Sequence, residues 1–316
     1  MYMLYLSFLT FLSMLVSSKR IAGRDWQTEF SARLFKRFFK AADRKGPQWS
    51  RKTLDEAGSK SLVVKRVDWE TVELGVVSAQ KATPRSVDAD SLRINVYMHG
   101  GGYVTGSAKS YGAFVARLAD QSKLLTYSLD YPLSPENPFP IPQEVSCKAI
   151  KEIAARHPKH QLVLIGDSAG AGLAISTALH AEAELRSRIA GLGLISPWVN
   201  PLAKTGSMVS NLPNDMFTLE ILEASYAAHM QGAEPMDTRA NFTEADLSSL
   251  PPLLIQGAGG EMFFDQIIEF SDRAKAQGVA VTTEVFDAQF HVFQVFAHHF
   301  EEAKRARASL VAFARG

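Results

Sequence analysis

The stretch Leu164-Ile165-Gly166-Asp167-Ser168-Ala169-Gly170 lies where a strand pattern changes into a helix pattern. The apolar run Leu162 to Ile165 is typical of a short buried strand, and small apolar residues continue over 171–175 as a helix. Gly-x-Ser-x-Gly between a strand and a helix predicts a tight turn that holds the serine in a strained conformation above the sheet. The two glycines are expected because a Cβ would clash across this turn. Ser168 is therefore a candidate nucleophile.

Length and composition indicate one large globular domain. The chain has 316 residues, 46% of them hydrophobic, and a net charge of +1 at pH 7. Such a chain can bury a large α/β core, and its balanced charge argues against a nucleic-acid partner. Cys147 is the only cysteine, which excludes an intramolecular disulfide, and no Cys/His cluster has zinc-site spacing. We expect neither a metal nor an organic cofactor.

The N-terminal region is unusual because residues 1–16 are apolar and uncharged and are followed by Lys19 and Arg20. A signal peptide carries its positive charge before the apolar segment. As a membrane anchor the segment is marginally short, and its basic flank would leave the rest of the chain on the cytoplasmic side. A small, weakly polar face suited to packing on protein is formed at helical spacing by Ser7, Thr10, Ser13 and Ser17. Residues 1–18 are therefore either an anchor or signal, or a packed cap helix. We expect a cytoplasmic protein in which membrane association through residues 1–18 is left open.

A second helix, predicted over residues 29–42, has phenylalanines on one side and basic residues on another. A basic amphipathic helix can lie on a membrane surface. It can equally pack on the domain by its apolar face. The sequence leaves both interpretations of this helix open.

A glycine run follows a predicted strand farther along the chain. Residues 62–67 and 72–77 are expected to form a first hairpin, and residues 78–90 a loop. The strand over 93–98 leads directly into His99-Gly100-Gly101-Gly102-Tyr103. Glycines allow backbone N–H groups to approach a substrate closely and to hold a developing oxyanion. The candidate oxyanion hole comprises Gly100, Gly101, Gly102 and Ala169, with the N–H groups of the last three as the assigned donors.

Strand and helix patterns then alternate, as in an α/β protein. The expected helices cover residues 110–121, 140–157 and 266–277, and the expected strands cover 124–129, 162–165, 192–198, 251–256 and 281–286. Only residues 201–246 depart from this alternation, with a helix predicted over 219–230.

The combination of three motifs resembles a known family. His-Gly-Gly-Gly-Tyr, the segment Asp130-Tyr131-Pro132-Leu133-Ser134-Pro135-Glu136-Asn137-Pro138-Phe139-Pro140, and Gly-Asp-Ser-Ala-Gly occur in this order. Together they resemble the hormone-sensitive-lipase-like carboxylesterases, which include bacterial esterases and arylacetamide deacetylase relatives. The likeness covers residues 95–293. One departure is Asn137, where the family usually has histidine; we interpret it as structural.

The resemblance implies an α/β-hydrolase fold, with a mostly parallel eight-stranded sheet flanked by helices and a helical cap. Residues 56–200 and 247–316 would form the catalytic domain, and residues 201–246 a cap insertion. The helices of residues 1–55 would complete the cap.

The resemblance also implies positions for a catalytic acid and a catalytic base. The loop after the strand at 251–256 usually has an aspartate with a second aspartate four residues later; here Glu261 takes the first place and Asp265 the second. We favour Glu261 as the acid, with Asp265 as the alternative at a helix start. The loop 287–294 carries His291, the expected base. The order Ser168, Glu261, His291 is nucleophile, acid, base, as in α/β-hydrolases.

The predicted function is a serine carboxylesterase acting on short- to medium-chain acyl esters. The alternatives are an amidase or deacetylase, a lipase, and least of all a non-catalytic ligand-binding receptor. The expected partner is a small-molecule ester, and a homodimer is left open. Candidate substrate-pocket residues are Tyr103, Asp167, Trp198, Met208, Met216, Phe217 and Val292.

Overall fold

A computed structural model describes residues 2–16, 23–58, 61–296 and 300–316. Its centre is an eight-stranded sheet in the order β1-β2-β4-β3-β5-β6-β7-β8, in which only β2 runs antiparallel to its neighbours. The strands are β1 (Val67–Leu74), β2 (Val77–Pro84), β3 (Arg93–Met98), β4 (Thr126–Leu129), β5 (Gln161–Asp167), β6 (Ile189–Ile195), β7 (Leu253–Ala258) and β8 (Val281–Phe286). Continuous apolar runs predict β3 to β7 because helices bury both faces of a parallel sheet.

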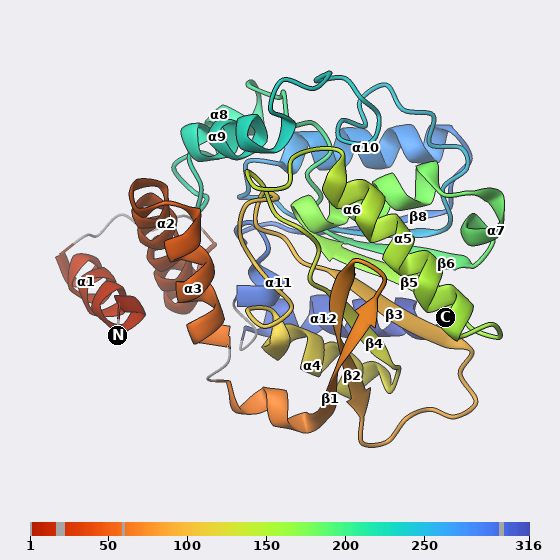
Figure 1. Cartoon of the computed structure of the whole chain (residues 1–316). Coiled ribbons are helices and arrows are strands. Elements are labelled where there is room, and N and C mark those ends of the chain that lie inside the picture. The colour runs from red at the N-terminus through yellow and green to blue at the C-terminus, as the bar shows by residue number, and fades with distance from the viewer. Residues whose placement is uncertain (1, 17–22, 59–60, 297–299) are drawn as a thin grey trace.

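Helices cover both faces of the sheet (Figure 1). One face packs against α5 (Ile141–Arg156), α6 (Ala169–His180) and α10 (Phe264–Ala276); the other packs against α4 (Gly112–Ser122) and α12 (Glu301–Arg315). Two separate apolar cores result, one on each side of the strands. The short helices α7 (Ala183–Arg186) and α11 (Phe293–Phe296) lie in connections. The expected fold class, an α/β-hydrolase sheet flanked by helices, is confirmed.

The predicted first hairpin is wrong in register. Residues Leu62–Arg66 form a 3-10 helix, and the hairpin strands are β1 and β2, so much of the expected loop 78–90 belongs to β2. The buried residues of β2 are Val77, Ala79, Ala82 and Pro84, which do not alternate strictly, and two of them are alanines. Their small side chains make the strand pattern hard to see in the sequence, whereas Leu62 and Val63 imitate a strand.

A separate group of helices lies beyond the carboxyl ends of the strands (Figure 1). It comprises α1 (Tyr2–Val16), α2 (Trp26–Lys45) and α3 (Pro47–Gly58) from the N-terminal region, with α8 (Ser207–Ser210) and α9 (Leu219–Met230) from the segment 201–246. The sequence did not predict α3. The described part of the chain contains no helix that is both long and apolar enough to cross a membrane.

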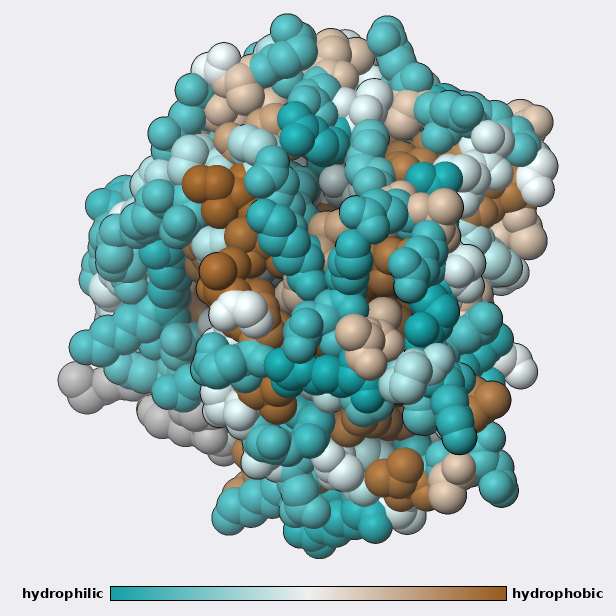
Figure 2. All heavy atoms as spheres, turned by 45° about the vertical axis from the view of Figure 1, so that its right-hand side comes forward, coloured by the Kyte–Doolittle hydropathy of each residue, from teal (hydrophilic) through white to brown (hydrophobic). Residues whose placement is uncertain are grey.

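The face of the molecule seen in Figure 2 is covered mainly by hydrophilic side chains, and hydrophobic atoms appear chiefly in recesses between them. Scattered apolar exposure of this kind is ordinary for a folded protein. The α1 helix differs, because six of its apolar side chains are exposed together: Leu4, Tyr5, Phe8, Phe11, Leu12 and Leu15.

Candidate active site

Ser168 lies between the end of β5 and the start of α6, at the tightest turn of the chain. Its backbone adopts φ 52° and ψ −119°, a region that L-residues rarely occupy. The predicted clash across the turn is confirmed for Gly166, where a Cβ would lie 2.4 Å from the carbonyl carbon of Gly170. At Gly170 the reason differs, because a Cβ there would meet the carbonyl oxygen of Met98, at the end of β3, at 2.1 Å. The turn therefore holds the serine at the base of the cavities described below.

His291 and Glu261 form a buried pair beside this serine. Nδ1 of His291 lies 2.6 Å from Oε2 of Glu261. The other carboxylate oxygen accepts hydrogen bonds from Ala258 N–H (2.7 Å) and the Ser196 hydroxyl (3.1 Å). The other side-chain nitrogen and oxygen atoms of the pair have hydrogen-bond partners within the protein. Nε2 of His291 has no partner among the described residues. His291 and Ser168 line one cavity of about 90 Å³.

The electrostatics of the pair favour a basic imidazole. Burial lowers the pKa of His291, but the hydrogen bond and charge of Glu261 act in the opposite direction and raise this pKa above its ordinary value. Burial also raises the pKa of Glu261, against the hydrogen bond from His291. An imidazole held in this way can accept a proton at Nε2.

Asp265, the alternative acid, lies elsewhere. Its carboxylate accepts the backbone N–H of Ser207 at 2.7 Å, at the first turn of α10. The carboxylate beside His291 is that of Glu261.

The glycine run lies beside Ser168, and its amides differ in availability. Gly101 and Gly102 have φ values of 115° and 62°, and their N–H groups have no acceptor among the described residues. Ala169 is the first residue of α6, where backbone N–H groups lack helical partners. Gly100 contradicts the prediction, because its N–H donates to Oδ1 of Asp167 at 2.8 Å and so cannot face an oxyanion.

Asp167 supports this loop instead of contacting substrate through its carboxylate. Besides Gly100 N–H, its oxygens accept the hydroxyls of Tyr97 and Tyr111, although the residue also borders the smaller cavity. Burial raises its pKa to about 6, against these hydrogen bonds. A carboxylate bound by three donors fixes the glycine loop against the nucleophile turn.

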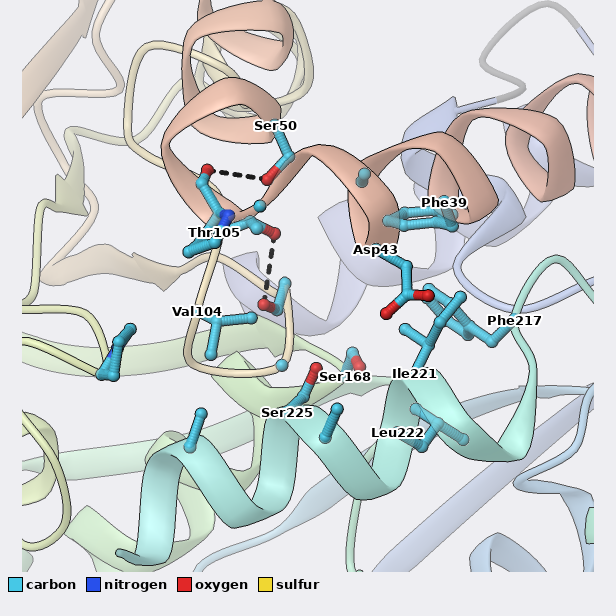
Figure 3. A pocket seen from close by; sticks show the side chains of 18 of the residues that line it. Phe39, Asp43, Ser50, Val104, Thr105, Ser168, Phe217, Ile221, Leu222 and Ser225 are labelled. Atoms are coloured by element: carbon cyan, nitrogen blue, oxygen red, sulfur yellow. Dashed lines mark hydrogen bonds between the residues drawn. The ribbon is translucent and has the colours of Figure 1, made fainter.

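A second cavity, of about 300 Å³, opens above Ser168 between α2, α3 and α9 (Figure 3). Of the predicted pocket residues, Trp198 and Phe217 line it, while Met216, Phe217 and Val292 line the smaller one. Two predictions are wrong. Tyr103 lines neither cavity and stacks on His229 with ring centroids 3.9 Å apart, and Met208 is buried in the core.

Several functional-site residues were not identified from the sequence. The walls of the larger cavity include Phe39 and Asp43 of α2, Ser50 of α3, and Ile221 and Leu222 of α9. Their approach depends on helix packing, for which the sequence holds no local signal beyond amphipathic spacing.

Asp215 and Ser196 were also missed. Asp215 accepts the backbone N–H groups of Met262 (2.8 Å) and His291 (3.1 Å), so one side chain joins the two loops that carry Glu261 and His291. Ser196 Oγ donates to Glu261 and accepts Val292 N–H at 3.2 Å. Both are positioning residues.

Comparison with known proteins identifies the family of this chain. A family model described as the alpha/beta hydrolase fold matches residues 95–295, and the chain belongs to that family. An esterase of Acinetobacter venetianus is 28% identical over 72% of this chain and 76% of its own length. An acetyl-hydrolase of Streptomyces hygroscopicus is 29% identical over 78% and 82%. The crystal structure of a bacterial hormone-sensitive lipase family esterase is 28% identical, with a TM-score of 0.85 over 93% of this chain and 98% of that one.

These similarities define the class more narrowly. The chain is a carboxylic ester hydrolase with the fold of the hormone-sensitive-lipase-like esterases, as its motifs indicated.

Proposed function

We propose that Ser168, His291 and Glu261 are the catalytic triad of a carboxylesterase that hydrolyses short- to medium-chain acyl esters. The observation that carries the proposal is the buried His291–Glu261 pair, whose unpartnered Nε2 shares a cavity with the strained serine. In this constellation the acid fixes the imidazole tautomer and the imidazole activates the hydroxyl.

The reaction proceeds through an acyl-enzyme. His291 takes the proton of Ser168 as the hydroxyl oxygen attacks the ester carbonyl, and Glu261 stabilises the imidazolium. The N–H groups of Gly101, Gly102 and Ala169 hold the oxyanion. His291 then protonates the leaving alcohol, and water repeats the sequence on the acyl-enzyme to release the acid.

The larger cavity supports the substrate class. Its walls are mostly apolar side chains, and about 300 Å³ lies at the small end of ligand pockets. Such a volume suits a short or medium acyl chain better than a long one. The name of the Streptomyces relative, an acetyl-hydrolase, is consistent with a small acyl group.

Replacing the nucleophile tests the triad. We expect Ser168→Ala to lower kcat on p-nitrophenyl butyrate by about 10⁴-fold or more, because the covalent route is lost. Ser187→Ala, an exposed serine remote from the site, is the matched control and should retain full activity. Near-normal turnover by Ser168→Ala would refute the assignment.

A substrate series tests the specificity. Rates on p-nitrophenyl esters of increasing acyl length, on an anilide and on an emulsified triglyceride separate esterase, amidase and lipase. The proposal predicts highest kcat/KM on short or medium esters. A maximum on the emulsion or on the anilide would replace it with one of the alternatives while leaving the triad intact.

A further inference from the structure

The outer face of α1 is apolar throughout its length. Its exposed side chains are Leu4, Tyr5, Phe8, Phe11, Leu12 and Leu15, which recur at helical spacing. Leu4, Phe8 and Leu15 are 75%, 60% and 68% exposed. No charged residue occurs in α1. A contiguous apolar surface of this kind marks a place of interaction.

The opposite face of α1 packs on α2, so the position of the helix on the protein is defined. Leu6 and Thr10 are buried on this face, and Phe11, at the border of the exposed face, contacts Trp26 at the start of α2 with ring centroids 6.2 Å apart. Near the other end, Lys45 of α2 lies 4.4 Å above the ring of Tyr2. The two helices therefore run side by side, with α1 on the outer side of α2 (Figure 1). The apolar face is a structural feature of the surface and points away from the protein.

The N-terminal region that contains this face is basic in sequence. Residues 1–58 hold eleven Lys and Arg and five Asp and Glu, a net charge of +6 in a chain whose total is +1. The remaining residues consequently carry −5. On α2 a basic stripe at helical spacing consists of Arg33, which also pairs with Glu29, and of Arg37, Lys40 and Arg44. An apolar face near a row of cations is complementary to an anionic membrane, which has a hydrocarbon interior and negatively charged headgroups.

We propose that α1 is an interfacial helix by which this protein docks on an anionic lipid surface. Aliphatic and aromatic side chains would enter the boundary between headgroups and acyl chains, as amphipathic surface helices do. The basic stripe of α2 would face the anionic headgroups. A described helix of 15 residues is about 22 Å long, too short to cross a hydrocarbon core of ~30 Å. The helix lies on the membrane in this proposal and does not span it.

Docking would also place the substrate cavity near the lipid. Phe39, Asp43 and Ser50, from α2 and α3, line the cavity above Ser168. The helix on which α1 packs, α2, thus also forms part of the cavity wall. Esters that partition into a membrane would be concentrated close to the opening.

Sedimentation of the full-length chain with lipid vesicles tests the proposal. The vesicles are phosphatidylcholine alone, or phosphatidylcholine containing phosphatidylglycerol. We expect binding to the anionic vesicles, weakened by high salt. The variant Phe8→Asp/Leu15→Asp should reduce the partition coefficient at least about tenfold, since one buried Leu or Phe contributes that much. Lys40→Glu/Arg44→Glu should reduce it by roughly tenfold or more.

Matched controls separate docking from folding and from self-association. Val76→Asp and Lys159→Glu alter equally exposed positions outside the N-terminal helices and should bind as the wild type does. Thermal melting by circular dichroism confirms that each variant is folded, independently of esterase activity. Absence of vesicle binding by the wild type, or equal loss in the controls, would overturn the proposal. So would a dimer in solution that Phe8→Asp/Leu15→Asp converts to monomer while vesicle binding is unchanged.

Discussion

At the scale of single residues, the site depends on the different environments of the two Glu261 oxygens. Oε1 is bound by Ala258 N–H and the Ser196 hydroxyl, which leaves Oε2 for His291. The Glu261 N–H also donates to the Ala258 carbonyl at 3.2 Å, so a tight turn draws the backbone back. We infer that this turn offsets the extra methylene of glutamate relative to the aspartate expected at this position.

The pH profile should show the influence of this carboxylate. Protonated His291 cannot accept the serine proton, so kcat/KM falls as the pH drops through the histidine pKa. Because Glu261 raises that pKa, we expect the midpoint of the acid limb above 6.5. Glu261→Gln removes the charge and should move the midpoint to lower pH while lowering kcat by about 10³–10⁴-fold. Asp265→Asn is the control and should leave the midpoint in place; an unshifted midpoint in Glu261→Gln would contradict the pairing.

At the scale of elements, α2 contributes Asp43, the one charged side chain among the described residues that line the larger cavity. The Asp43 carboxylate points into this cavity toward Ile221 and Phe217 of the opposite wall (Figure 3). An anionic group in a mostly apolar wall repels carboxylates and attracts cations. We therefore expect residues of α2 to contribute to substrate selection, although they precede the sheet in the chain.

Substrate charge tests this role of Asp43. We expect Asp43→Asn to raise kcat/KM for an ester with a terminal carboxylate by about three- to tenfold relative to its neutral analogue, since a partly solvated pair interacts by ~1 kcal/mol. A cationic ester should respond in the opposite direction. Asp55→Asn, on α3 and outside the cavity, serves as the control. Equal changes for all three esters would show that Asp43 acts only on structure.

At the scale of the whole molecule, the N-terminal segment is joined to the loop that carries His291. Arg24, which is buried, donates from Nε to the Ala288 carbonyl at 2.7 Å and from Nη2 to the Gln289 carbonyl at 3.3 Å. Nη1 lies 3.6 Å from Glu29 of α2. The Arg24 side chain thus connects the first helices with the loop that carries His291, more than 260 positions away in the sequence.

Removing this connection should affect both stability and turnover. Arg24→Ala leaves two carbonyls without their donor and Glu29 with Arg33 as its remaining ion-pair partner, which costs about 2 kcal/mol or more. We expect Tm to fall by several degrees. We also expect kcat to fall by a larger factor than KM rises, because the loop that carries His291 loses its hydrogen bonds to Arg24. Arg24→Lys should recover part of both. Unchanged kcat in a destabilised Arg24→Ala would show that the contact serves folding alone.

Much of this protein was determined by short stretches of its sequence. The strand-turn-helix around Ser168, the glycine run and the loop bearing His291 could be predicted because each depends on local sterics and on apolar periodicity. The first hairpin could not be predicted, because the buried residues of β2 include two alanines. Their hydrophobicity differs little from that of the residues expected in a loop. Gly100 was misassigned because its N–H direction depends on Asp167, which belongs to another strand.

The tertiary structure alone decided which side chains meet. Glu261 and Asp265 are four residues apart and chemically similar, and only the turn after β7 brings one of them to His291. Asp215, Ser196, Arg24 and the cavity walls of α2, α3 and α9 act across long sequence separations. Local sequence patterns report the sterics and hydrogen bonding within one backbone segment. A functional site is assembled from side-chain contacts between elements that are distant in the sequence, and these contacts form only when the elements pack together.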